Sequence, residues 1–148
     1  MWTNSRSLFL SRIMTWGFLV VLTAGSVMIP RLLSWYLAYT GKGMESYRPL
    51  FFALLLCVPP AFTALLSLER LLRNISAGDV FTAGNTGLIR VVSWCCFAVS
   101  AVMLCFCFFN VFGFFVGIVA AFMGLILRVV KNVIAQAIDI KAENDLTV

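Results

Sequence analysis

A run of 37 residues, 91–127, contains no charged side chain and no proline. As a single helix it would be about 55 Å long, whereas the hydrocarbon core of a bilayer is only about 30 Å thick. The run therefore has to turn back on itself, and it brings a polar residue and a glycine together at one place, Asn110 and Gly113. Two membrane-spanning helices joined by a tight hairpin are predicted, which excludes a soluble globular domain.

Two further apolar stretches, 13–30 and 49–68, complete the predicted membrane domain. Neither contains Lys, Arg, Asp or Glu, and each is long enough to cross a bilayer. With 62% hydrophobic and 11% charged residues, the 148-residue chain leaves no separate soluble domain. We expect an all-α integral membrane protein, a single domain formed by a four-transmembrane-helix bundle. The predicted spans are about 13–30, 49–68, 88–109 and 112–130.

The basic residues predict that both termini are cytoplasmic. Of the 11 Lys and Arg, only Arg31, Lys42 and Arg48 fall between spans one and two, and the other eight fall on the opposite side. Cytoplasmic loops are enriched in Lys and Arg, so the side with eight is predicted to be inside. The net charge of +5 is then explained by contacts with lipid headgroups, and no direct nucleic-acid binding is expected.

The first span has an alternative interpretation as a cleaved signal peptide. Arg6 and Arg12 resemble its basic region, 13–24 its apolar region, and 24–26 the small residues at a cleavage site. Because the apolar stretch continues to Ile29 and is long enough to span, we favour a retained helix.

Metal, cofactor and enzyme chemistry find little support in the composition. The chain has no histidine, and its five cysteines all lie inside predicted spans, where they are expected to act as small apolar side chains. The candidate catalytic acids, Glu69 and Asp79, are isolated from any cluster of histidines or metal ligands. No ionisable residue lies in mid-membrane, which argues against proton-coupled transport. We expect a non-enzymatic protein with no metal and no cofactor.

Small residues in span four predict close helix packing. Gly113, Gly117, Ala121 and Gly124 are spaced by 4, 4 and 3, which produces one continuous groove along the helix. Within the chain, the helix that packs into this groove is expected to be span one, which is also rich in small residues, or span three. A second copy, giving a homodimer, is the alternative.

Pro59 and Pro60 lie at the centre of span two and are a candidate hinge. Each lacks an N–H, so the carbonyls of Leu55 and Leu56 lose their usual donors. A moving break at a binding site and a fixed kink, filled by Thr63 or by packing, are both consistent with this pattern. We favour the fixed kink, because no second broken helix accompanies it.

The cytoplasmic loop, 69–87, is predicted to be short and ordered. Span two is expected to continue as a helix to about Ile75 and to end in the turn 76–79. Thr82 is a candidate N-cap for the next helix, and Phe81 is placed as its hydrophobic staple.

The tail, 131–148, is predicted to be an amphipathic helix. It can fold back on the loop, lie among the headgroups or hold a partner. Its apolar stripe consists of Val130, Val133, Ile134, Ala137 and Ile138.

One loop motif and the end of the chain resemble a known family. The motif comprises Leu71, Leu72, Asn74, Ile75, Gly78, Val80, Phe81, Asn85, Ile89 and Arg90, and the closing segment is 143–148. Together with the four spans they resemble the bacterial membrane proteins grouped as domain-of-unknown-function family 2975. The resemblance implies a multi-pass protein of the bacterial cytoplasmic membrane. It also implies a link to a helix-turn-helix regulator encoded nearby, but no biochemical activity.

Three functions remain as hypotheses. The favoured one is a regulator or adaptor that binds a soluble cytoplasmic partner. A passive transporter or channel subunit acting as an oligomer is the main alternative, and an enzyme acting on lipid or prenyl substrates is the third. The candidate partner-binding residues are Arg73, Asn74, Gly78, Phe81, Asn85, Arg90, Asp145 and Leu146.

Overall fold

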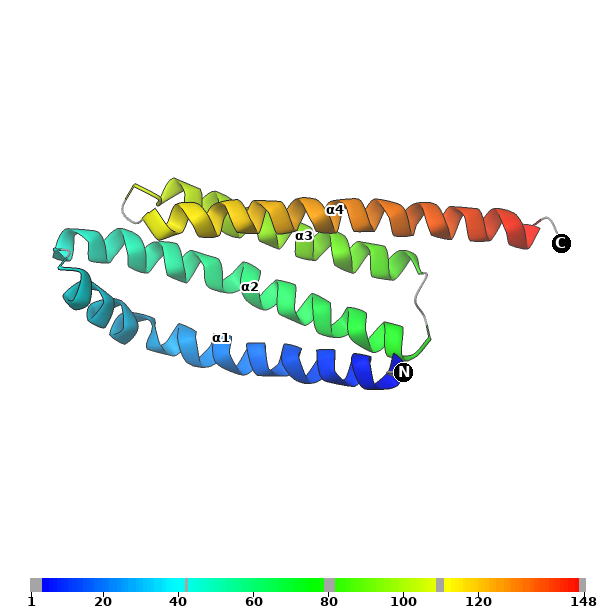
Figure 1. Cartoon of the computed structure of the whole chain (residues 1–148), viewed down its shortest axis with the longest axis horizontal. Coiled ribbons are helices and arrows are strands. Elements are labelled where there is room, and N and C mark those ends of the chain that lie inside the picture. Colours follow the sequence, from blue (N-terminus) through cyan, green and yellow to red (C-terminus); the bar gives the residue numbers. More distant parts are fainter. Residues whose placement is uncertain (1–3, 42, 79–81, 109–110, 147–148) are drawn as a thin grey trace.

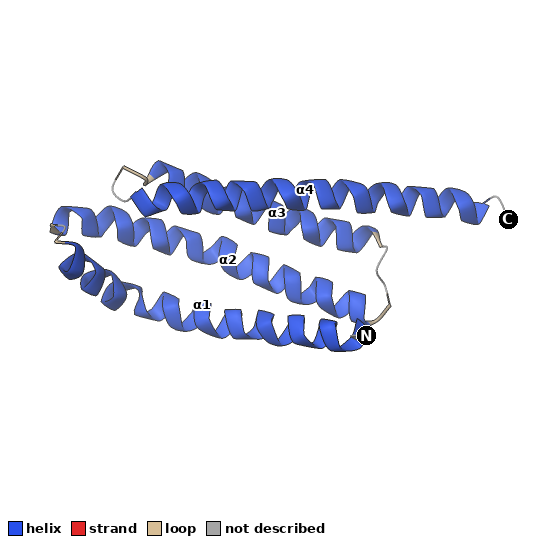
Figure 2. Ribbon diagram, viewed as in Figure 1, coloured by secondary structure: helices blue, strands red, loops and turns tan. Residues whose placement is uncertain are grey.

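The computed structural model describes residues 4–41, 43–78, 82–108 and 111–146, and these residues form an all-helical protein (Figures 1 and 2). Four of its helices are long and apolar enough to cross a membrane, which agrees with the predicted multi-pass architecture. The elements are α1 (Asn4–Thr40), the short 3-10 helix η1 (Met44–Ser46), α2 (Tyr47–Ser76), α3 (Ala83–Cys105) and α4 (Val111–Leu146).

The helices pack in chain order. α1 packs on α2, α2 on α3 and α3 on α4, and the last contact is the most extensive. Among the described residues, α1 has no comparable contact with α3 or α4. Figure 1 shows the start of α1, the α2–α3 connection and the end of α4 gathered at one end of the molecule, which we call the terminal end. The α1–α2 and α3–α4 connections lie at the opposite end, the distal end.

α1 is longer than the predicted first span, because it continues past Pro30 to Thr40. A proline inside a helix removes one backbone N–H and displaces the preceding turn, and Figure 1 shows that α1 changes direction in its last third. The continuation is supported by packing: Leu33 and Leu37 meet Leu50 of α2 in a buried cluster at the distal end. Tertiary contact here outweighs the local preference to stop at proline.

α2 runs as one helix through Pro59 and Pro60. The hydroxyl of Thr63 donates to the carbonyl oxygen of Pro59 at 2.9 Å, rather than to the carbonyls of Leu55 or Leu56 that the prolines deprive of donors. Thr63 therefore reinforces the turn after the prolines and does not fill the positions they leave.

The small-residue groove of α4 faces α3. A Cβ added at Gly117 would lie 2.8 Å from Cγ of Leu104, and one at Gly113 would lie 3.2 Å from the carbonyl oxygen of Met103. At Gly124 the carbonyl oxygen accepts a buried 2.8 Å hydrogen bond from Oγ of Ser93. Ala121, on the same helix, is half-buried. Because the glycines of α4 have no side chains, the backbones of α3 and α4 can approach closely. Membrane helices associate in this way because lipid offers no hydrophobic driving force between them.

We predict that Gly117→Leu lowers the stability of the protein in detergent by about 1–3 kcal/mol, because the new side chain overlaps Leu104. Gly17→Leu on α1 is the matched control, since a Cβ at Gly17 meets no described atom within 4 Å. Thermal unfolding of both variants provides the comparison. Equal unfolding temperatures for Gly117→Leu and the wild type would show that this face of α4 is not closely packed.

Candidate functional site

The connection between α2 and α3 begins with a glycine-dependent turn. The N–H of Ala77 donates to the carbonyl oxygens of Arg73 and Asn74, and that of Gly78 donates to Ile75, each at 3.1 Å. Gly78 has φ +93, a conformation that L side chains rarely adopt. It ends α2 in the manner expected of a glycine after a helix C-terminus.

Two asparagines join the end of α2 to the start of α3. Nδ2 of Asn74 donates to Oδ1 of Asn85 at 2.9 Å. Asn85 is only 1% exposed, the most deeply buried polar side chain among the described residues. Thr82 occupies the predicted N-cap position with an extended backbone, although its side chain makes no capping hydrogen bond within the described part of the chain. The predicted staple residue, Phe81, lies outside the described residues.

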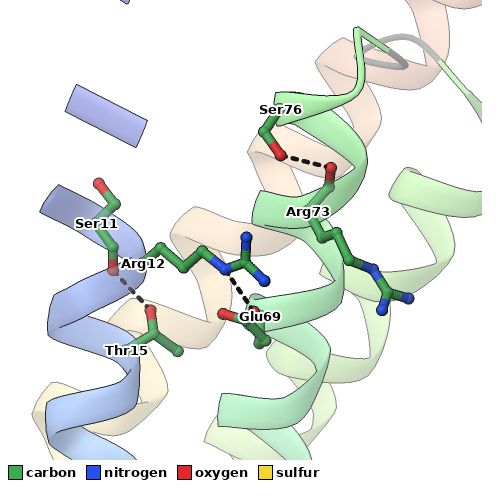
Figure 3. Close-up of polar contacts among 6 residues, drawn as sticks. All are labelled: Ser11, Arg12, Thr15, Glu69, Arg73 and Ser76. Atoms are coloured by element: carbon green, nitrogen blue, oxygen red, sulfur yellow. Dashed lines mark hydrogen bonds and ion pairs between the residues drawn. The ribbon is translucent and has the colours of Figure 1, made fainter. Parts of the chain in front are cut away.

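An ion pair joins α1 to α2 at the same end. Nε of Arg12 lies 2.9 Å from Oε1 of Glu69, and Figure 3 shows the two side chains reaching toward each other. The Glu69 side chain is 15% exposed and that of Arg12 is 48% exposed. Oε2 of Glu69 is buried and has no hydrogen-bond partner among the described residues. Arg12 therefore supplies the compensation for a carboxylate largely withdrawn from solvent.

α3 and α4 are joined in turn by a cation–π contact. The guanidinium carbon of Arg128 lies 5.5 Å from the ring centroid of Trp94. Each consecutive pair of helices thus shares at least one polar contact. Arg12–Glu69 joins α1 to α2 and Asn74–Asn85 joins α2 to α3, whereas Trp94–Arg128 adds to the Ser93–Gly124 hydrogen bond between α3 and α4, near the middle of α3. Sequence reasoning missed the first and the third. The available signal was the depth of the residues in neighbouring spans: Arg12 and Glu69 lie at matching depths, and so do Trp94 and Arg128.

The predicted partner-binding residues differ in accessibility. Arg73, Gly78 and Arg90 are exposed, Asn74 is half-buried and Asn85 is buried. Figure 3 shows the Arg73 side chain directed away from the Arg12–Glu69 pair. The side chains of Phe81, Asp145 and Leu146 lie outside the described part of the structure. A partner can meet the arginines directly, whereas Asn85 can act only by positioning the loop.

The C-terminal part of α4 continues beyond α3. Gly124 lies opposite Ser93 and Gly117 opposite Leu104, so antiparallel counting places Ala83, the first residue of α3, near residue 135 of α4. Roughly 11 residues of α4, about 16 Å of helix, then extend past α3, as Figure 1 shows.

The predicted amphipathic stripe of the tail is unevenly covered. Val130 and Val133 are exposed, as is Ile140 beyond the stripe, whereas Ile134 and Ile138 are half-buried. α4 continues in one direction and does not fold back across the end of α2 (Figure 1).

The described residues contain no group of three or more His, Cys, Asp or Glu side chains placed to hold a metal ion. The five cysteines are free thiols.

We predict that Asn74 and Asn85 are energetically coupled. Asn85→Ala should destabilise the protein more than Asn74→Ala, because Asn85 is the more deeply buried partner. A double-mutant cycle measured by unfolding in detergent should give a coupling energy of roughly 0.5–2 kcal/mol. Strictly additive effects would mean that the hydrogen bond does not hold the loop.

Comparisons with known proteins place the chain in a family. No curated protein and no solved structure matches it. One family model, described as "Protein of unknown function (DUF2975)", matches residues 32–148, from the last turns of α1 to the end of the chain. The match includes the α2–α3 connection and the whole of α4. The chain therefore belongs to the DUF2975 family.

Proposed function

We propose that this protein is a non-enzymatic regulator or adaptor of the bacterial cytoplasmic membrane, with its terminal end in the cytoplasm. The described basic residues support this orientation, because those at the distal end are only Arg31 and Arg48. The others lie toward the terminal end or in the tail: Arg6, Arg12, Arg70, Arg73, Arg90, Arg128, Lys131 and Lys141.

The extension of α4 past α3 is the observation that carries the proposal. α4 has 36 residues and is about 54 Å long, far more than the roughly 30 Å of hydrocarbon it has to cross. Its last three turns stand clear of α3, with exposed Val133 before them and exposed Ile140 within them. A helix presented in this way suits a partner that receives an amphipathic helix in an apolar groove.

Exposed arginines at the terminal end define the charge expected of the partner. Arg73 and Arg90 flank the α2–α3 connection, and both are exposed. Guanidinium groups pair preferentially with carboxylates, so the partner's groove should have acidic residues at its rim. A soluble helix-turn-helix regulator, as the family resemblance implies, would bind here through its own protein surface and not through DNA.

The alternative function, a passive pore, would need polar side chains that are available to a solute inside the membrane, and two of the hydroxyls there are already engaged. Ser93 donates to the carbonyl of Gly124, and Thr63 donates to that of Pro59. Each of these hydroxyls has used its only proton, so neither can donate a hydrogen bond to a passing solute. The adaptor proposal therefore has the stronger physical support.

Co-purification from native membranes tests the proposal. Deletion of residues 136–148 and the double change Arg73→Gln/Arg90→Gln should each reduce recovery of the soluble partner about tenfold, the effect of losing roughly 1.4 kcal/mol. Arg31→Gln/Arg48→Gln, at the distal end, is the matched control and should leave recovery unchanged. The recovered protein must also bind again when purified and added back.

Three outcomes would contradict the proposal. They are recovery of no soluble protein, full recovery with both terminal-end variants, and failure of the purified partner to bind again. Unchanged thermal unfolding of the variants in detergent is required in each case, so that loss of binding is not mistaken for loss of fold.

A further inference from the structure

A cavity of about 360 Å³ lies between α1 and α2. Its walls come from residues 21–32 of α1 and 54–61 of α2. The two helices are fastened on either side of it. Toward the distal end, Leu33 and Leu37 pack against Leu50, and toward the terminal end Arg12 pairs with Glu69. α1 is the outer helix of the row, next to α2 (Figure 1).

The chemistry of the walls selects a hydrocarbon occupant. None of the described residues that line the cavity is charged, and only Ser26 and Cys57 carry a polar atom in the side chain. The Ser26 hydroxyl already donates to the carbonyl oxygen of Thr23 at 2.9 Å. The Cys57 thiol is only a weak donor and a weak acceptor. The side chains of the wall therefore offer little to orient a polar molecule, and a water molecule would lack the two to four partners it needs.

The cavity lies in the middle of two spans, so the molecules around it are lipid tails. Left empty, its walls would lose the dispersion contacts that a close-packed interior provides. Fatty acyl chains are by far the most concentrated hydrocarbon at this depth, and mass action favours them over any rarer apolar ligand. Its volume falls within the range of known ligand sites.

We propose that this cavity binds one fatty acyl chain of a membrane glycerophospholipid. Gly25 lies in the wall of this cavity, and a Cβ at this position would meet no described atom within 4 Å, so a larger side chain there would extend into the open space. The bound chain fills the space between the two fixed contacts and so completes the packing of α1 on α2. This site is independent of the proposed cytoplasmic partner.

Lipid retention measures the binding directly. The full-length protein, purified in a mild detergent that removes loosely held lipid, should carry one phospholipid in native mass spectrometry. Gly25→Trp places a large side chain in the cavity and should lower the retained fraction about tenfold. Gly17→Trp is the matched control on the same helix, since Gly17 is also open but does not line this cavity. Its retained fraction should equal that of the wild type.

A second measurement does not require the tryptophan variant to fold. With the other four cysteines replaced by alanine, Cys57 in the cavity wall becomes the sole thiol. Its labelling by N-ethylmaleimide should slow about tenfold when dioleoyl phosphatidylglycerol is added to the delipidated protein. An unchanged labelling rate would overturn the proposal. Wild-type protein without bound lipid, or equal retention by the wild type and Gly25→Trp, would overturn it as well.

Discussion

The structure depends on the fact that a bilayer interior supplies neither water for hydrogen bonds nor a hydrophobic force between helices. Backbone polar groups must therefore be satisfied inside helices, and the helices need close contact or polar bonds to stay together. α3 and α4 meet this need in the middle of the membrane, where Gly117 admits Leu104 and Ser93 bonds to Gly124.

Polar contacts take over toward the terminal end, where the bilayer's polarity rises. The Arg12–Glu69 pair holds α1, and the Asn74–Asn85 bond holds the loop between α2 and α3. Arg73 and Arg90, on either side of that loop, remain exposed at the end of the molecule where α4 extends past α3. α1 packs mainly on α2, so it depends on this one helix for its position. It is held there at both ends, by the Arg12–Glu69 pair toward the terminal end and by Leu33 and Leu37 against Leu50 toward the distal end.

The sequence predicted the helices better than it predicted their partners. The uncharged run 91–127, which is too long for one crossing, predicted two helices, and the structure has α3 and α4 there. The spacing of Gly113, Gly117 and Gly124 predicted a closely packed helix face. Both predictions follow from local helix geometry. The extension of α1 past Pro30 was missed, since it depends on packing of Leu33 and Leu37 against α2. The Arg12–Glu69 pair joins residues 57 positions apart, and no local pattern relates them. Asn85 was predicted as a contact for a partner, but composition alone does not distinguish a buried amide from an exposed one.

The central claim is that four spans place the terminal end in the cytoplasm and the distal end outside. Alkaline phosphatase, which is active only outside the cytoplasm, can be fused after Asn110 in one variant and after Val148 in another. The account predicts high activity for the first fusion and none for the second, because α4 returns the chain across the membrane. Activity from both fusions, or from neither, would contradict the α3–α4 hairpin crossing, and activity from the second fusion alone would reverse the orientation.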